Sequence, residues 1–482
     1  MRKALLLFIF LLQISFVAQS QQYVNANYGR ALHERAIKCV VQTDSTVLML
    51  GFGQGYSYVL HRTKTNGDTL YSKYVYSHDF YYGVDLIALP NEKAIIVGGN
   101  GGLAKIDPYG NETWSKSFRR TEYNAGALIN DTTFAVVGSK GIFSHMEMVP
   151  DLGWDSIFIS RVYIGLYHVS GKLLQEKVVS YGTDDYEEAR GIIYTTNKTL
   201  LVEGDYYRYE PNSFHDDFLL TLTPDLKVIA DTVYPRGTVY GKPKMENSQG
   251  NFMNCAFKTV KAAQDNDIFI QELNANGDIL WEKTYDLKGD DYATAMLESD
   301  GYYYVTGGTG NKKNILPEYD DIVLLKLDLQ GDTIWTKTYT LPSGQGAVDI
   351  KELNDSMLVI LGVTDYQTQC PQIMNPGYIC SDMYLMYVNK ETGYSKMYPD
   401  APQTILAKSE VLVYPNPSHG QVSIKAKEIK SVTVRNAIGK AINAKQRAVS
   451  EQETEISGLE KGIYFMLVET EKGFENKRVV IM

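Results

Sequence analysis

The chain has few cysteines, no excess of basic residues and, after its first twenty positions, no long apolar run. Four cysteines in 482 residues are too few for a disulfide-stabilised scaffold. Lysine and arginine number 47 against 57 aspartates and glutamates, and the net charge of −10 argues against a nucleic-acid-binding protein, which would carry a basic surface. Beyond residue 20 no segment is apolar over the roughly 20 residues that a membrane helix needs, so we expect no transmembrane anchor.

Catalytic signatures are also missing. There is no His-Glu-x-x-His, no Gly-x-Ser-x-Gly and no phosphate-binding glycine loop with a lysine. The histidines are scattered without the spacing of metal ligands. The sequence therefore predicts no cofactor and no metal centre. It offers no positive case for an enzyme, although catalytic residues gathered from distant segments would leave no such signature.

Apolar and aromatic residues, in contrast, are plentiful. Hydrophobic residues make up 44% of the chain, which is enough to bury a large core and excludes a disordered protein. Tyrosine outnumbers phenylalanine 36 to 16, and such amphipathic rings suit strands with a solvent-facing side.

The first twenty residues have the layout of an export signal. Arg2 and Lys3 supply a short positive region, residues 4–12 are uninterrupted apolar residues, and Ala18-Gln19-Ser20 matches a signal-peptidase site. We therefore expect residues 1–20 to be a signal peptide that is removed from the mature chain. The alternative is an uncleaved membrane anchor, but polar residues cut the apolar stretch short of a membrane span.

One phrase recurs along the middle of the chain: a glycine, an aromatic residue four positions later and a lysine six positions later. The clear copies are Gly67-Asp68-Thr69-Leu70-Tyr71, Gly110-Asn111-Glu112-Thr113-Trp114, Gly277-Asp278-Ile279-Leu280-Trp281 and Gly331-Asp332-Thr333-Ile334-Trp335. A degenerate copy begins at Gly171, and further copies are expected near Asp225 and Gly393. The mean period is about 54 residues, which is typical of propeller blades or of another repeat array.

Each copy is predicted to be a unit of four strands. In the clearest copy we expect strands at 292–298, 302–306, 322–328 and 333–339, and the third is an apolar run that suits a strand buried between sheets. The glycine of the phrase supplies the positive φ of a tight hairpin. We therefore predict an all-β fold in which residues 21–396 form a β-propeller of seven blades. Six blades are the alternative, and an array of β-sandwiches is the competing architecture.

The copies differ in length almost entirely between their second and third strands. The extra residues lie at 139–154, 205–216, 309–320 and 364–381. In a four-stranded blade this connection is on the same face as the link to the next blade, and repeat proteins commonly bind ligands on the face that carries their insertions. We therefore predict one face with short turns and one elaborated face that is rich in Tyr and Asp.

The elaborated face holds the candidate ligand-binding residues. Aromatic rings can stack on a sugar or a peptide while carboxylates accept hydrogen bonds from hydroxyls or amides. The predicted ligand-binding residues are Tyr206, Tyr207, Tyr209, His215, Asp185, Asp291 and Trp154. We predict that they bind a glycan or a protein. The alternatives are a packed surface without a ligand, calcium at the acidic links, and a polysaccharide-active hydrolase or lyase that uses carboxylates of adjacent blades.

The cysteines fall into two groups. Cys370 and Cys380 lie close together in a turn-rich segment and are predicted to form a disulfide in an oxidising compartment. Cys39 and Cys255 lie in apolar, strand-like runs and are expected to be buried thiols. Metal ligation is disfavoured because no second Cys or His lies at ligand spacing.

The composition changes after residue 396. Residues 397–410 contain two prolines and are predicted to be a linker, and residues 411–482 form short alternating strands separated by turn residues. The landmark residues of this last segment are Tyr414, Pro415, Asn416, Pro417, Gly420, Gly439, Lys440, Gly462 and Tyr464.

Residues 411–482 closely resemble the type A sorting domain of the type IX secretion system of Bacteroidetes. The resemblance implies an immunoglobulin-like β-sandwich that passes through the periplasm and is recognised by an outer-membrane translocon. It also implies removal by a sortase-like peptidase, followed by release or by attachment to surface lipopolysaccharide. The alternative is an ordinary binding module that stays on the mature protein.

The two parts also differ in charge. From Val411 onward, 11 lysines and arginines face 8 aspartates and glutamates, a net charge of +3. Loss of Arg2 and Lys3 with the signal takes the total to −12, so the propeller and its linker carry −15.

Overall fold

The structure is a computed structural model. It describes residues 26–28, 34–53, 57–75, 83–149, 153–182, 186–208, 214–235, 243–260, 265–310, 320–340, 345–366, 380–395, 411–427, 429–436, 441–450, 452–470 and 473–482. The chain divides into two compact units, Met1–Lys396 and Met397–Met482, which are described separately. Within the described residues the regular structure is β-strand and no helix is present.

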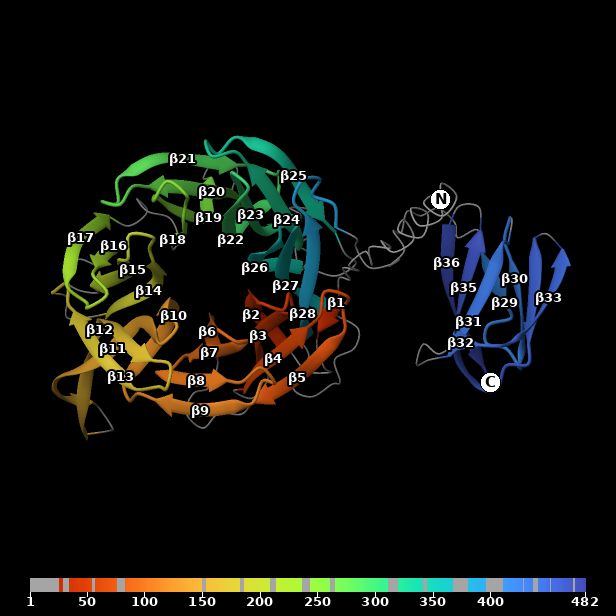
Figure 1. Ribbon diagram of the computed structural model, residues 1–482, viewed down its shortest axis with the longest axis horizontal. Helices are drawn as coiled ribbons and strands as arrows, with labels where there is room; N and C mark the ends of the chain where they lie inside the picture. The colour runs from red at the N-terminus through yellow and green to blue at the C-terminus, as the bar shows by residue number, and fades with distance from the viewer. Residues whose placement is uncertain are drawn as a thin grey trace, which may run out of the picture. The chain divides into compact units, whose positions relative to one another are not determined.

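In the first unit, the described strands form seven four-stranded antiparallel sheets arranged as the blades of a ring (Figure 1). Blade one has β2 (Glu34–Val41), β3 (Val47–Gly53), β4 (Ser57–Thr63) and β5 (Thr69–Val75). Blade two has β6 (Gly83–Leu89), β7 (Lys93–Gly98), β8 (Gly102–Ile106) and β9 (Glu112–Ser117). Blade three has β10 (Thr121–Asn130), β11 (Thr133–Val149), β12 (Gly153–His168) and β13 (Leu173–Val179). Blade four has β14 (Tyr186–Tyr194), β15 (Leu200–Arg208), β16 (Phe214–Leu222) and β17 (Val228–Pro235).

The remaining blades repeat this order, in which the first strand faces the centre of the ring and the fourth faces outward (Figure 1). Blade five has β18 (Pro243–Glu246), β19 (Phe252–Val260), β20 (Asp265–Leu273) and β21 (Ile279–Tyr285). Blade six has β22 (Asp290–Ser299), β23 (Tyr302–Gly310), β24 (Asp320–Leu327) and β25 (Thr333–Tyr339). Blade seven has β26 (Gln345–Asn354), β27 (Met357–Tyr366), β28 (Cys380–Asn389) and, as its outer strand, β1 (Ala26–Tyr28).

The predicted all-β propeller with seven blades is confirmed. Ile322–Leu327 of β24 are all buried, as expected of a third strand that lies between neighbouring sheets. The apolar cores lie between blades: Val47 and Met49 of blade one pack with Leu361 and Met383 of blade seven. Cys39 and Cys255 are free and buried.

β1 closes the ring. It pairs antiparallel with β28, with Ala26 opposite Leu385 and Tyr28 opposite Met383. Every other blade comes from one continuous stretch of chain, whereas blade seven takes its outer strand from the N-terminal end of the unit. The repeat phrase does not predict this closure.

A residue with positive φ follows the third strand in every blade. In six blades it is a glycine with φ between 65° and 87°, namely Gly67, Gly110, Gly171, Gly277, Gly331 and Gly393. In blade four Leu226 takes this place with φ 60°. The N–H of Gly331 donates to the carbonyl of Asp328 at 3.0 Å, and the other turns repeat this type of bond. The copy near Asp225 is degenerate because a leucine occupies its glycine position.

The aromatic residue and the lysine of the phrase bind the turn of the next blade. Trp114 Nε1 in β9 donates to the carbonyl of Val169 at 3.2 Å, and Lys116 Nζ donates to the carbonyl of Gly171 at 2.9 Å. Lys283 Nζ of blade five donates to the carbonyl of Gln330 in blade six, and Trp335 Nε1 of blade six donates to the carbonyl of Glu391 in blade seven. The hydroxyls of Tyr285 and Tyr339, each eight residues after the glycine of its phrase, donate to the carbonyls of Gly331 and Gly393. The repeated phrase therefore stabilises the ring by linking each of these outer strands to the following blade.

Each inner strand contains a β-bulge at the same position. The residues of the second strand opposite this point are Gly51, Gly98, Gly138, Gly204, Asn254, Gly307 and Gly362. A Cβ added to Gly138, Gly204 or Gly307 would lie 1.9, 2.0 or 1.8 Å from a carbonyl oxygen of the inner strand, so only glycine fits there. Blade five holds Asn254 instead; its side chain is fully buried, and neither amide atom has a hydrogen-bond partner among the described residues.

The second unit is a β-sandwich of two four-stranded sheets. One sheet has β29 (Leu412–Tyr414), β30 (Gln421–Lys425), β34 (Glu453–Ser457) and β33 (Lys445–Ser450). The other has β32 (Ala441–Ile442), β31 (Ser431–Asn436), β35 (Gly462–Thr470) and β36 (Gly473–Ile481). Val422 and Ile456 of the first sheet pack against Val434 and Met466 of the second in one core, which confirms the predicted sandwich.

Candidate functional site

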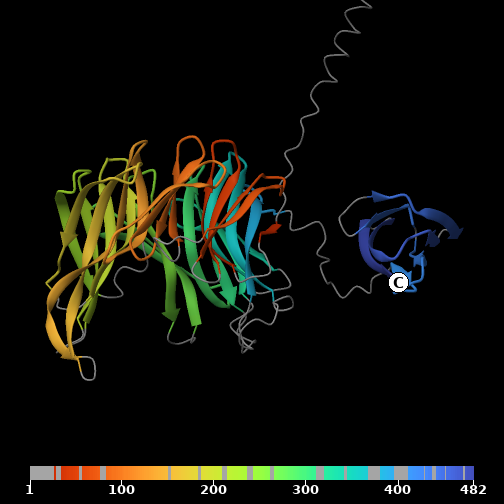
Figure 2. The same cartoon turned by 90° about the horizontal axis from the view of Figure 1, so that it is seen from below.

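The ends of the second strands and the starts of the third strands lie on one face of the ring, which we call the elaborated face (Figure 2). The residues predicted as extra loop are partly strand. β11 runs to Val149 and β12 starts at Gly153, while β15 runs to Arg208 and β16 starts at Phe214. The insertions thus lengthen hairpins, because their residues pair across the two strands.

A polar cluster on this face joins blades three and four. Arg190, the bulge residue of β14, places Nε 2.9 Å from Glu188 Oε1 and Nη2 2.8 Å from Asp205 Oδ2. The Tyr186 hydroxyl donates to Glu188 Oε2 at 2.7 Å, and Asn124 Nδ2 of blade three lies 3.2 Å from the same oxygen. We call these five residues the inner-strand cluster, since four of them belong to first strands.

The inner-strand cluster is partly accessible. The side chain of Asp205 is 1% exposed and that of Glu188 is 14% exposed, whereas Arg190 is 39% exposed. Burial lowers the pKa of Arg190, but the carboxylates of Asp205 and Glu188 outweigh burial and raise it. The cluster therefore presents a guanidinium held in place by two carboxylates, an arrangement that can donate hydrogen bonds in fixed directions.

Two of the predicted ligand-binding tyrosines lie beside this cluster, in β15. Tyr207 is partly exposed, and its ring lies 6.3 Å from that of Tyr186 at an angle of 75°. Tyr206 is 8% exposed; its ring stacks on Tyr181 at 4.9 Å, and its hydroxyl is 3.4 Å from Asp216 Oδ2. Tyr207 thus extends the cluster, whereas most of the Tyr206 ring packs inside the blade.

Other predicted site residues are described only in part. His215 lies opposite Tyr207 and Trp154 lies opposite Met148 in the strand registers, and Cys380 is the first residue of β28; the side chains of His215, Trp154 and Cys380 are outside the described residues. Tyr209, Asp185 and Cys370 lie wholly outside them, so the predicted disulfide stays a prediction.

Asp291 is buried at the start of β22 and holds the link from blade five. Its Oδ2 accepts a hydrogen bond from the N–H of Leu287 at 2.6 Å, and its Oδ1 accepts one from the Thr309 hydroxyl. Burial raises the pKa of Asp291 although these bonds oppose the shift. A carboxylate oxygen of Asp291 lies within 4.8 Å of oxygens of Asp267 and Asp286. These three residues are the described group that could hold a cation, but calcium takes six to eight oxygens and Asp291 already binds the link.

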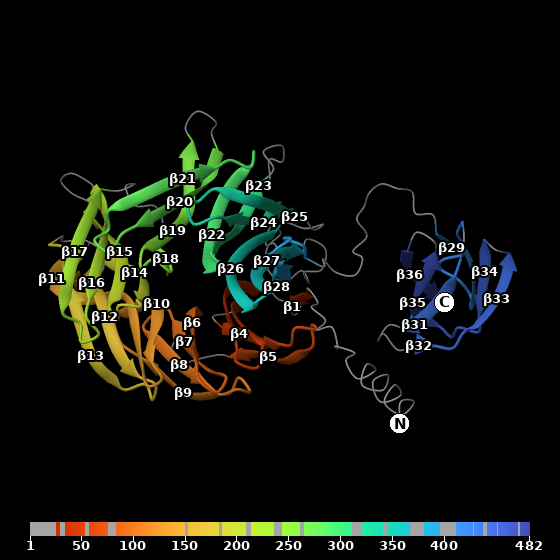
Figure 3. The same ribbon diagram turned by 45° about the horizontal axis from the view of Figure 1, so that its top comes forward.

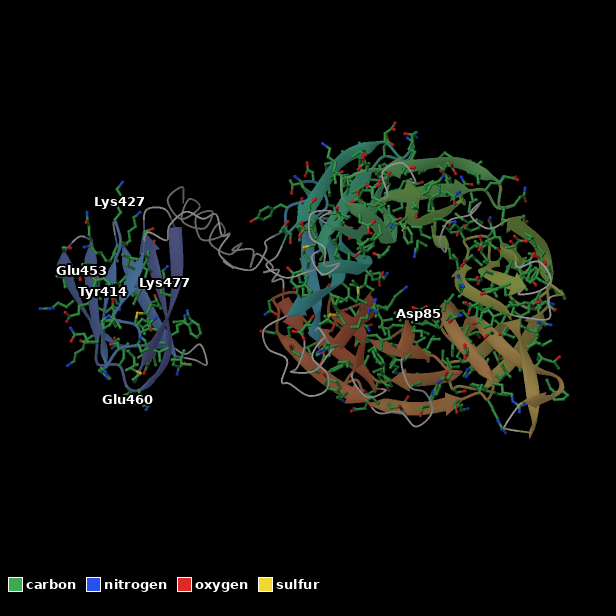
Figure 4. The ribbon with its side chains drawn as sticks, turned by 180° about the vertical axis from the view of Figure 1, so that it is seen from behind. Asp85, Tyr414, Lys427, Glu453, Glu460 and Lys477 are labelled. Carbon is green, nitrogen blue, oxygen red and sulfur yellow. The ribbon has the colours of Figure 1, made fainter. Side chains whose placement is uncertain are left out.

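Charged residues also lie near the centre of the ring in blades seven, one and two; Figure 4 labels Asp85 there. Asp85 accepts a hydrogen bond from the N–H of Gly126 at 2.9 Å and lies 3.5 Å from Lys38 Nζ. Asp349 accepts one from the N–H of Cys39 at 3.1 Å. Asp85 and then Asp349 raise the pKa of Lys38. These carboxylates bind the backbone of the next blade, which is a structural role.

Asp382 in β28 is expected to make the stability of the propeller depend on pH. Burial, with a smaller effect of Glu34 and an opposing effect of His61, raises its pKa to about 6. The folded chain therefore binds this proton more tightly than the unfolded chain, so the stabilisation is full below about pH 4 and is lost as the pH rises through about 6. We expect Asp382→Asn to raise the free energy of unfolding by about 1–2 kcal/mol more at pH 7.5 than at pH 4.5. Urea unfolding at both pH values tests this, and an equal effect at both would contradict it.

Glu188 and Arg190 are functional candidates that the sequence reasoning missed. They alternate with the buried residues Glu187 and Ala189, a pattern that also fits any half-buried strand. One feature of the sequence could have pointed to them. Both residues come directly after an Asp-Asp-Tyr link, at the start of the first strand of a blade.

In the second unit, the sorting-motif residues fasten the entry of the chain to its last strand. The Tyr414–Pro415 and Asn416–Pro417 peptides are cis. Asn416 Oδ1 accepts a hydrogen bond from the N–H of Val480 at 2.9 Å. The Tyr414 hydroxyl donates to Glu453 Oε1 at 3.1 Å, and Figure 4 labels these two residues. The motif therefore joins β29, β34 and β36.

Of the other described motif residues, Gly420 lies at a turn, and Gly462 and Tyr464 lie in β35. The Tyr464 hydroxyl donates to the carbonyl of Glu460 at 3.0 Å, and Gly420 has φ 101°. Gly462 begins β35, while Gly439 and Lys440 lie outside the described residues.

Comparison with known protein families supports the identification of the sorting motif. Residues 412–482 match the family model of the secretion system C-terminal sorting domain. No curated protein matches the chain. Among the described residues, we find no helix with the length and apolar character that crossing a membrane requires.

Several solved structures are similar in fold at low identity. BamB from Moraxella catarrhalis has 12% identity and a TM-score of 0.39, over 72% of this chain and 83% of its own. A protein of unknown function from Bacteroides caccae has 12% identity and a TM-score of 0.38, over 61% and 93%. One from Dyadobacter fermentans has 11% identity and a TM-score of 0.42, over 77% and 99%.

The family match covers the sandwich and not the propeller. A sorting domain of this kind directs its chain through the type IX secretion machinery to the cell surface or the medium. Residues 412–482 are therefore a secretion system C-terminal sorting domain, joined to a seven-bladed β-propeller as its cargo.

Proposed function

We propose that the exported propeller binds an extracellular glycan or protein through its elaborated face. In this proposal residues 1–20 are the signal peptide, 21–396 the propeller, 397–410 the linker and 411–482 the tail. The translocon recognises the tail and a sortase-like peptidase removes it. The observation that carries the proposal is the inner-strand cluster around Arg190.

The chemistry of this cluster suits a polar ligand. Arg190 is the most accessible of its charged groups, and Glu188 and Asp205 hold its guanidinium at 2.9 and 2.8 Å. A guanidinium fixed in this way can donate to sugar hydroxyls or peptide carbonyls without first losing side-chain freedom. Tyr207 places a partly exposed ring beside it. Together they supply a directional donor and a stacking surface.

A hydrolase or lyase would need a different electrostatic arrangement here. A glycosidase requires one carboxyl that stays protonated until it donates to the leaving group, with a second carboxylate nearby. In the inner-strand cluster the guanidinium of Arg190 lies 2.9 Å from Glu188 and 2.8 Å from Asp205, so both carboxyl groups are already occupied by the same cation. This arrangement supports binding over catalysis.

Substitution of Arg190 tests the proposed function. We expect Arg190→Gln in the mature chain to weaken ligand capture about tenfold or more in glycan-array and pull-down experiments, because a charge-assisted donor is lost. Lys227→Gln is the matched control, since Lys227 is 79% exposed in a surface pair with Asp225 and should leave capture unchanged. Equal capture by the wild type and Arg190→Gln, or no capture in either screen, would overturn the proposal.

A further inference from the structure

Strand β35 of the sorting sandwich is apolar on both of its faces. Tyr464, Met466 and Val468 are buried in the core between the two sheets. Ile463 and Phe465 alternate with them; Ile463 is 38% exposed and Phe465 is partly exposed. Successive side chains of a strand point to opposite faces, so Ile463 and Phe465 lie on the outer face of the sheet, in which β35 runs between β31 and β36 (Figure 3).

The neighbouring strands extend this apolar area and place a cation beside it. Val480 of β36 lies opposite Ile463 and is partly exposed. Arg435 of β31 lies opposite Phe465 and is exposed. We call Ile463, Phe465, Val480 and Arg435 the outer-face patch. It combines an aromatic ring, two aliphatic side chains and a guanidinium, and both aromatic residues and arginine are enriched in protein–protein interfaces.

The corresponding strand of the other sheet, β34, is polar on its outer face. Its Ile456 is buried in the core, whereas Glu453 and Glu455 lie on the opposite side of the strand. Glu455 pairs with Arg447 at 2.9 Å, and Glu453 accepts the hydrogen bond from Tyr414. A sheet with one face in water normally alternates apolar and polar residues in this way. The apolar outer side chains of β35 do not serve the core, and exposed apolar area of this kind marks an interaction surface.

We propose that the outer-face patch is the surface through which the sorting domain docks on a protein component of the secretion machinery. The partner's surface is apolar where it covers Ile463 and Phe465 and acidic where it meets Arg435. A domain of this family is recognised during export, so it needs a contact surface besides its core. The inference goes beyond the proposed function, because it concerns recognition of the tail and not the ligand of the propeller.

Charge favours an acidic partner over a second copy of the chain. From Val411 onward the net charge is +3, whereas the propeller and its linker carry −15. An acidic docking surface would therefore attract the tail and repel its cargo. Two copies joined through the patch would instead bring together two tails of like charge and two Arg435 side chains, which opposes their association.

Export of the full chain from cells that carry the type IX machinery tests the proposal. We expect Ile463→Asp to lower the amount outside the cell about tenfold or more, because it removes an apolar contact and adds a charge that an acidic partner repels. Ile463→Leu keeps the apolar contact and should be exported normally. Arg435→Glu should lower export several-fold, since it reverses the charge that meets the partner. Val449→Asp is the matched control, because Val449 in β33 of the other sheet is 51% exposed, and its export should be unchanged.

Urea unfolding of each purified full chain shows whether its tail is as stable as that of the wild type. Normal export of Ile463→Asp, an equal loss in Val449→Asp, or a loss of export that merely follows the loss of stability would overturn the proposal. Normal export of Arg435→Glu would overturn the acidic partner. Wild-type dimers that Ile463→Asp dissociates, together with its normal export, would assign the patch to a second copy instead. Arg190→Gln should be exported like the wild type, so failure of the proposed function leaves this test intact.

Discussion

Substitution of Gly307 by alanine is expected to lower the free energy of unfolding of the propeller by about 3 kcal/mol or more. The new Cβ would lie 1.8 Å from the carbonyl oxygen of Tyr292 and 2.8 Å from Cα of Ala293, and both are backbone atoms of the paired strand. Relief requires movement of β22 or β23, which are bonded to each other along their length. Urea unfolding of the mature chain measures the loss.

Asn254→Ala is the matched control, because Asn254 occupies the same position in blade five and already carries a Cβ. The substitution removes a fully buried amide that has no partner among the described residues. We expect it to be neutral or to stabilise the fold by about 1 kcal/mol. If Gly307→Ala and Asn254→Ala had the same effect, the bulge would not be the reason for glycine at this position.

Loss of β1 is expected to destabilise the ring by about 2–4 kcal/mol, since a deleted outer strand leaves the edge of β28 unpaired. The test replaces Ala26–Tyr28 by Gly-Gly-Ser, which keeps the chain length but removes strand propensity. Thermal unfolding should show a lower midpoint. Asn27→Ala is the control and should change the midpoint little, because it keeps the backbone pairing with Tyr384. An unchanged midpoint in the Gly-Gly-Ser variant would show that β1 does not close the ring in solution.

The blade count was predictable because the same physical requirement recurs in each blade. The turn after the third strand needs positive φ, which favours glycine, and the outer strand needs side chains such as Trp114 and Lys116 that reach the next blade. The strand β1 was not predictable in this way. It is a short strand without a turn phrase, and its partner β28 lies at the other end of the unit.

The candidate site was predictable only as a region. Insertions between second and third strands pointed to the elaborated face, and Tyr207 lies beside the cluster that the structure shows there. Arg190 escaped prediction because a bulge shifts the register of β14 at this residue, and alternation along a strand does not reveal a bulge. Asn254 escaped because the glycine pattern that it interrupts appears only when the seven registers are aligned.

The pairing of β1 with β28 also determines when, during synthesis and folding, the ring can close. β1 is among the first segments of the propeller to be synthesised, whereas its partner strand β28 ends at Asn389. The ring therefore stays open until nearly the whole unit has been synthesised. Contacts between such distant segments form late and slow the final step of folding. Until then the edge of the last blade is exposed to other chains. A newly made propeller therefore passes through an aggregation-prone interval just before the sorting domain, which follows it in the chain, becomes available.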